Sequence, residues 1–124
     1  MEIPKDLKFT ENHEWVKVEG GQARTGITFH AQNELGDIVY VELPEVGRQV
    51  DKGEDFVVIE SVKSVSDVYA PVSGEVVEVN KDLMDSPELI NESPYEEGWL
   101  AVIEISDDTG INDLMSSGEY ESIL

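Results

Sequence analysis

The sequence contains no cysteine. This absence excludes disulfides, zinc or iron sites that use Cys ligands, and a cysteine nucleophile. If the protein takes part in thiol chemistry, a prosthetic group must supply the sulfur.

Basic residues are also scarce. Lys and Arg total 8 against 28 Asp and Glu, which gives a formal net charge of -20. This charge opposes sequence-independent binding to nucleic acid phosphates or to anionic lipids. The acidity fits solubility, adaptation to high salt or steering toward basic partner surfaces, and the sequence leaves these three open.

Several further signals are missing. No apolar run approaches membrane-spanning length, and no glycine-rich segment has the spacing of a phosphate-binding loop. Two histidines, His13 and His30, make a poor metal site without cysteine or tight ligand spacing. Residues 1–8 lack both the apolar region of a signal peptide and the Arg-rich pattern of a transit peptide. We therefore expect a soluble, cytoplasmic protein without a metal, membrane or nucleic acid partner.

What is present indicates a mostly β chain of one domain, which suits 124 residues. Two strands within 9–27 form a hairpin about a Gly-Gly pair, and Thr28 caps a short helix over 30–35 that Gly36 ends. The segments 47–53 and 80–97 are expected to be connections. Further strands are expected at 37–43, from Phe56, after Ser64, at 74–79 and at 99–105, and the tail is expected to form two short helices separated near Ser117-Gly118.

A weak internal repeat divides the chain. Residues 36–41 are similar to 74–79, and residues 58–60 are similar to 102–104, in the same order. Such a repeat predicts two similar β units packed face to face with quasi-twofold symmetry.

Lys63 is the only basic residue between Lys52 and Lys81. Its segment, 60–71, connects two β-prone stretches through small polar residues, with no glycine or proline before Pro71. This pattern predicts a strand, a tight exposed turn and a second strand, with Lys63 near the tip. An ammonium at such a tip is either a passive surface charge or an attachment point for covalent modification.

The residues around Lys63 resemble the lipoylation site of the glycine cleavage system H proteins. Glu60-Ser61-Val62-Lys63-Ser64 is followed by Asp67-Val68-Tyr69-Ala70-Pro71-Val72-Ser73-Gly74-Glu75-Val76. The resemblance extends from about Phe9 to Leu124, because other segments similar to the family occur in order. They are His13-Glu14-Trp15-Val16, Gly26-Ile27-Thr28, Ala31-Gln32, Leu35-Gly36-Asp37-Ile38-Val39, Leu43-Pro44-Glu45-Val46-Gly47, Pro87-Glu88-Leu89-Ile90-Asn91 and Gly98-Trp99-Leu100.

The resemblance implies a barrel-sandwich hybrid of two antiparallel sheets over residues 1–124, with quasi-twofold symmetry. A short helix would follow the N-terminal hairpin, and residues 106–124 would form a helical tail. Lys63 would carry lipoate in an amide bond, which removes the lysine charge and adds a long neutral arm ending in a dithiolane. We expect a monomeric carrier rather than an enzyme.

The same resemblance implies four partners. The carrier would take an aminomethyl group from a pyridoxal-phosphate glycine decarboxylase (the P protein) and present it to a folate-dependent aminomethyltransferase (the T protein). Dihydrolipoyl dehydrogenase (the L protein) would then reoxidise the arm. The fourth partner is the lipoate-attaching enzyme, for which Glu60 is a candidate recognition residue.

The cargo adds a physical requirement. A loaded arm holds a thioaminal that water hydrolyses, so between partners it should rest in a cleft that excludes solvent. Carboxylates would hold its cationic amine by charge-assisted hydrogen bonds. The family pattern points to Glu14, expected on an exposed strand face, and Asp67, with Asn12 and His30 as neighbours.

Of four alternatives, the residues disfavour the first two and leave the last two open. A biotinyl carrier would have methionines beside the lysine, where Val62 and Ser64 stand, and a lipoyl domain of a 2-oxoacid dehydrogenase would be smaller and have a Thr-Asp-Lys type of site. An H-like donor that passes lipoate to other proteins would have nearly the same surface. An unmodified acidic interaction module is the fourth. One departure from the family is Glu96, where some members have glycine, so a different turn is expected there.

Overall fold

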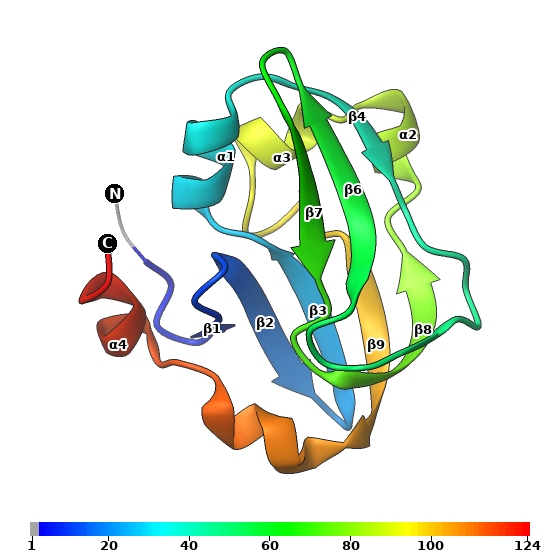
Figure 1. Ribbon diagram of the computed structural model, residues 1–124, viewed down its shortest axis with the longest axis vertical. Coiled ribbons are helices and arrows are strands. Elements are labelled where there is room, and N and C mark those ends of the chain that lie inside the picture. Colours follow the sequence, from blue (N-terminus) through cyan, green and yellow to red (C-terminus); the bar gives the residue numbers. More distant parts are fainter. Residues whose placement is uncertain (1–2) are drawn as a thin grey trace.

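The chain folds into two antiparallel β-sheets that face each other (Figure 1). The computed structural model describes residues 3–124, except for the side chains of residues 108 and 109. The larger sheet has the order β1 (Lys8–Phe9), β2 (Glu14–Glu19), β3 (Gln22–Ile27), β9 (Ala101–Asp107), β8 (Ser73–Val79) and β5 (Gln49–Val50). The smaller sheet has the order β4 (Ile38–Glu42), β6 (Asp55–Ser61) and β7 (Val65–Tyr69). The predicted fold, mostly β with two antiparallel sheets and few short helices, is therefore confirmed.

The first helix is defined by its caps as predicted. In α1 (Phe29–Leu35), the side chain of Thr28 accepts a hydrogen bond from the backbone N–H of Ala31, and Gly36 ends the helix with a φ of 80°. A positive φ is where glycine is least strained, so this position favours glycine on local grounds alone.

Other local expectations were wrong. The connection 47–53 contains strand β5, and the loop-rich segment 80–97 contains the four-residue helices α2 (Asp82–Asp85) and α3 (Leu89–Glu92). Beyond β9, a 3-10 helix spans Asp108–Asp113 and α4 spans Ser117–Glu121. The predicted break at Ser117-Gly118 lies inside α4, because Ser116 caps this helix through a reciprocal pair of hydrogen bonds with Glu119.

Each half of the internal repeat forms one antiparallel strand pair, and the two pairs lie in different sheets. The first half forms the antiparallel pair β4 and β6, with Val41 opposite Ile59. The second half forms the antiparallel pair β8 and β9, with Val76 opposite Ile103. One pair in each sheet is the arrangement that quasi-twofold symmetry requires, and β7 with its hairpin lies between the two halves along the chain.

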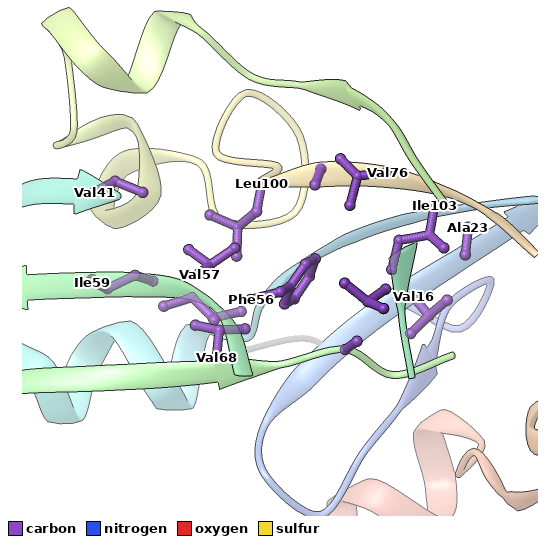
Figure 2. Close-up of a cluster of buried hydrophobic side chains, with 14 of the residues drawn as sticks. Val16, Ala23, Val41, Phe56, Val57, Ile59, Val68, Val76, Leu100 and Ile103 are labelled. Carbon is purple, nitrogen blue, oxygen red and sulfur yellow. The ribbon is translucent and has the colours of Figure 1, made fainter. Parts of the chain in front are cut away.

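The main core fills the space between the sheets (Figure 2). It includes Ile59 of β6 and Val68 of β7, both buried, together with residues of the larger sheet such as Ile103. Burying an aliphatic side chain of this size contributes about 1.5–3 kcal/mol. The root of the β6–β7 hairpin is thereby fixed in the core, while its tip projects at one end of the molecule (Figure 1).

A second apolar cluster joins the C-terminal helix to the first two strands. Its buried members are Leu7, Phe9, Trp15 and Tyr120, and the rings of Phe9 and Tyr120 stack with their centroids 4.7 Å apart. The indole Nε1–H of Trp15 donates to the carbonyl of Pro94 at 2.8 Å, and the indole covers Gly26 so closely that a Cβ there would overlap it. These contacts fix strand β2 to the C-terminal helix, to the segment at Pro94 and to strand β3.

Candidate functional site

Lys63 lies at the exposed apex of the β6–β7 hairpin. The apex is braced by Ser61, whose N–H donates to the carbonyl of Ser64 at 2.8 Å. The Ser61 hydroxyl oxygen also accepts from the N–H groups of Lys63 and Ser64, at 3.3 and 3.1 Å. Hydroxyl side chains often form such local turns. The small polar residues around Lys63 therefore shape the turn and leave the lysine side chain outside it.

The apex is also fastened to the segment that follows α1. The N–H of Val62 donates to the carbonyl of Asp37 at 3.0 Å. The side chain of Asn91 donates to the carbonyl of Gly36 and accepts from the N–H of Ile38, both at 2.9 Å. A Cβ on Gly36 would lie 3.3 Å from Cε of Lys63, so the lysine stem rests over this glycine at the C-terminal end of α1.

A cleft of about 250 Å³ lies next to this end of α1. Leu35, the neighbour of Gly36, lines it, and its walls are the loop before β2, one face of α1 and strand β7. All four residues predicted for an arm cleft lie on this cleft, although they come from three separate segments. They are Asn12, Glu14, His30 and Asp67.

Glu14 is the most unusual of the four, because its side chain is buried, with an exposed fraction of only 3%. The expectation of an exposed strand face was wrong, since the start of β2 packs against the end of β7. The hydroxyl of Thr10 donates to Oε1 at 2.6 Å, and the N–H of Tyr69 donates to Oε2 at 3.0 Å. Among the described residues, no Lys, Arg or His forms an ion pair with this carboxylate.

Burial raises the pKa of Glu14, and the two hydrogen bonds from Thr10 and Tyr69 offset this only in part. Among the described residues, the ionised carboxylate thus has no ion-pair partner to compensate its buried charge. A carboxylate has about four acceptor positions, of which these two donors use two. Glu14 can therefore accept further hydrogen bonds from a group that enters the cleft.

The other predicted residues are more accessible. Asp67 on β7 and Asn12 in the loop before β2 are exposed, and His30 is half-buried on α1, with Nε2 3.8 Å from Oε1 of Glu34. Glu60 is half-buried on β6, opposite Val65, and does not line the cleft. A second cavity, of about 350 Å³, shares Asn12 and Glu14 with the cleft and continues on the other side of them.

Two residues of this region were missed as functional candidates. His13 lines the cleft, with its ring centroid 4.5 Å from that of His30, and Tyr120 of α4 bonds to it. The paired rings are not accompanied by a metal-binding group: within the residues that the structure describes, no three His, Asp or Glu side chains are gathered for a metal ion. No sequence signal connects residues 13 and 120, which are 107 positions apart.

Two further features bear on the predictions. Glu96 stands in a turn after Ser93 and does not require a positive φ, because His13 is the only non-glycine residue with one in the described chain. The glycine of other family members is therefore not needed here for backbone conformation. None of the described helices is long and apolar enough to span a bilayer.

Together, the two-sheet fold and an exposed lysine at a braced hairpin apex are the features expected of a carrier domain. Residues 7–124 match the model of the family described as "Glycine cleavage H-protein". The chain belongs to the glycine cleavage H-protein family, whose members are carrier subunits rather than catalytic enzymes.

Individual relatives match over almost the whole chain. It is 59% identical over 123 residues to the glycine cleavage system H protein of Bacillus subtilis (strain 168), covering 99% of this chain and 97% of the relative. It is 58% identical over 122 residues to that of Halalkalibacterium halodurans, covering 98% and 95%. The crystal structure of a glycine cleavage system H protein from Mycobacterium marinum superposes with a TM-score of 0.90 at 41% identity, covering 98% of both chains.

Proposed function

We propose that Lys63 carries lipoate and that the protein shuttles an aminomethyl group in the glycine cleavage system. The group would come from the pyridoxal-phosphate glycine decarboxylase and go to the folate-dependent aminomethyltransferase, and dihydrolipoyl dehydrogenase would reoxidise the arm. The observation that carries this proposal is the buried carboxylate of Glu14, which has no ion-pair partner among the described residues and lines a cleft whose wall at Leu35 adjoins Gly36, over which the Lys63 stem rests. When attached, lipoate supplies a disulfide that accepts two electrons and a one-carbon fragment.

The position of Lys63 supports covalent attachment. Its Nζ is on an exposed turn that a modifying enzyme can reach, while Ser61 and the bond from Val62 to Asp37 keep the turn in one shape. Acylation removes the positive charge, and the stem already rests over Gly36 next to the cleft. The arm then has a short path along Leu35 into the cleft.

The dimensions of β7 are compatible with this path. A strand rises about 3.3 Å per residue, which puts Asp67 roughly 13 Å from Lys63 along the backbone. A lysine side chain extended by the lipoyl acyl chain covers such a span. Asp67 and Glu14 would then face the end of the arm from two sides.

Glu14 is suited to hold a cationic amine because its own surroundings are incomplete. Its ionised form is disfavoured by burial, and a bound ammonium would supply both the missing charge and hydrogen-bond donors. Asp67 would add a second carboxylate at the exposed side of the cleft. Asn12 and His30 would complete the wall through their polar atoms.

The remaining predictions belong to the same proposal. Glu60 lies three residues before Lys63 and outside the cleft, where the lipoate-attaching enzyme would contact it as a recognition residue. A monomeric state and a cytoplasmic location complete it.

Intact mass after expression with a lipoate-attaching enzyme tests the attachment. We expect one lipoyl increment, which Lys63→Ala abolishes and Lys81→Ala, a matched exposed lysine, leaves in place. An increment that survives Lys63→Ala would overturn the proposal.

The shuttle role is tested separately by glycine-dependent loading of the lipoylated protein in the presence of the decarboxylase. A lipoylated protein that is never loaded, but that donates its lipoyl group to an acceptor domain, would support the relay alternative instead.

A further inference from the structure

His13 has a backbone conformation that residues other than glycine seldom adopt. The N–H of His13 donates to the carbonyl of Thr10 at 3.1 Å, and the N–H of Thr10 donates to the carbonyl of Glu14 at 3.0 Å. This hairpin loop ends with His13 at a φ of 68°, a position where glycine is usual. Such strain persists only where surrounding contacts stabilise it.

The stabilising contact is a chain of hydrogen bonds that ends at the imidazole. The N–H of Ala31 donates to Oγ1 of Thr28 at 3.3 Å. Oγ1 of Thr28 lies 2.7 Å from the hydroxyl of Tyr120, which lies 2.7 Å from Nδ1 of His13. Thr28 and Tyr120 are buried, with exposed fractions of 0% and 1%.

The direction of this chain follows from counting donors. Among the described residues, the hydroxyl hydrogen of Thr28 has only the Tyr120 oxygen as an acceptor. Every hydrogen in the chain is therefore used when Thr28 donates to Tyr120 and Tyr120 donates to Nδ1 of His13. If Nδ1 carried a proton, it would donate to Tyr120. One of the two hydroxyl hydrogens would then have no acceptor among the described residues, and a buried unsatisfied donor is costly.

The chain also joins the two walls of the cleft. His13 stands between Asn12 of the loop and Glu14, the first residue of β2, and Thr28 caps α1, which carries His30. We propose that Tyr120 is a positioning residue for the arm cleft: its hydroxyl holds His13 neutral, with the ring proton on Nε2, and fixes this loop to the N-terminus of α1. The C-terminal helix thereby sets the shape and the charge of a cleft wall that it does not itself line.

The charges around His13 agree with this assignment. Burial lowers the pKa of His13, the nearby His30 lowers it further, and the Glu34 carboxylate opposes them. The other titratable groups that face this region are Tyr120 from α4, Glu14 from β2 and Asp67 from β7.

The functional consequence rests on the proposed shuttle role. The cargo is a cationic amine, which a protonated imidazole on the cleft wall would repel. A neutral His13 leaves the carboxylates of Glu14 and Asp67 as the dominant charges. Retention of the cargo should therefore weaken as His13 becomes protonated.

The tautomer is measurable on the protein without lipoate. Nitrogen-15 NMR of the imidazoles should show His13 as the neutral Nε2–H tautomer at neutral pH. An Nδ1–H tautomer would overturn the assignment, and this measurement decides it without any substitution and independently of lipoylation.

Tyr120→Phe removes only the hydroxyl. Its titration by NMR should show the pKa of His13 shifted upward. Tyr95→Phe is the matched control, because the Tyr95 hydroxyl accepts from the N–H of Phe29 at the same end of α1 at 3.0 Å without bonding to His13. It should leave the pKa of His13 unchanged. Equal pKa values in all three proteins would contradict the positioning role.

The functional test is the rate at which the lipoylated, loaded protein releases its aminomethyl group at different pH values. Release of the aminomethyl group should become faster in Tyr120→Phe than in the unsubstituted protein as the pH falls through the His13 midpoint. A shifted pKa with identical release profiles would remove the link to the cleft. Failure of Lys63 to accept lipoate would instead overturn the proposed function and leave the tautomer assignment standing.

Discussion

Replacing Glu14 by Gln removes the charge of the buried carboxylate and keeps its shape. The carboxylate accepts from Thr10 at one oxygen and from Tyr69 at the other. A glutamine can keep the bond from Tyr69 with its carbonyl oxygen, while its amide group faces the hydroxyl of Thr10, which can rotate to accept. What the substitution removes without replacement is the charge offered to the cleft.

The substitution should change two quantities, the rate at which the cargo is released and the free energy of unfolding. A hydrogen bond to a charged group is worth about 1.5–3 kcal/mol. Since 1.36 kcal/mol corresponds to a tenfold rate change, Glu14→Gln should speed release of a loaded aminomethyl group by roughly ten- to a hundredfold. The free energy of unfolding at neutral pH should change by less than about 1 kcal/mol, because a neutral hydrogen bond replaces a desolvated charge.

The stability effect has a definite pH dependence. Because burial raises the pKa of Glu14 in the folded state above its ordinary value of 4.5, the folded protein binds more protons than the unfolded chain between these two values. The stability that Glu14 contributes is therefore fully present below about pH 4.5 and is lost as the pH rises through the folded pKa. Glu14→Gln should be most destabilising in acid, and the difference should shrink as the pH rises.

Release can be measured without a partner enzyme. The lipoylated protein is reduced and loaded with formaldehyde and ammonia, and intact mass then follows the loss of the aminomethyl group. Glu19→Gln, the same change at the exposed end of β2, is the control and should release at the unsubstituted rate. Asp67→Asn should have a smaller effect than Glu14→Gln, because water competes at an exposed carboxylate. Equal release from Glu14→Gln and the unsubstituted protein would refute the clamp.

Two glycine substitutions test how the site is supported. Gly36→Ala should lower the free energy of unfolding by about 1–2 kcal/mol because of its positive φ, and lipoylation should slow because the new Cβ displaces the stem of Lys63. Gly26→Ala should lower the free energy of unfolding by about 1–3 kcal/mol, since the new Cβ overlaps the indole of Trp15. Gly118→Ala is the control and should be nearly neutral, because a Cβ there meets nothing within 4 Å. Denaturant unfolding and intact mass measure both, and a Gly26→Ala protein as stable as Gly118→Ala would contradict the packing argument.

Local signals predicted the elements whose chemistry is local. The glycine pair at positions 20 and 21 forms the β2–β3 turn with φ values of 55° and 78°, and Thr28 and Gly36 cap α1 at the expected residues. The hairpin at Lys63 was predicted for the same reason. By contrast, α2 and α3 have only four residues each and no side-chain caps, so no pattern in the sequence distinguishes them from loop.

The cleft depended on contacts between distant segments. Alternation along β2 places Glu14 on the same face as the buried Val16, which was a usable signal for burial. It was obscured because Trp15, on the opposite face, is buried as well, in the second cluster. The strained His13 gave no such signal, since its stabilising partner is Tyr120, at the other end of the chain.

The most direct test of the carrier role uses the isolation of Lys63 between Lys52 and Lys81. Trypsin cleaves after unmodified lysine and arginine, so an unmodified chain yields the peptides 53–63 and 64–81. If Lys63 bears lipoate, protein from its native source should give the uncleaved peptide 53–81 with one lipoyl increment at Lys63. Complete cleavage after Lys63, in protein from cells that make and attach lipoate, would contradict the account.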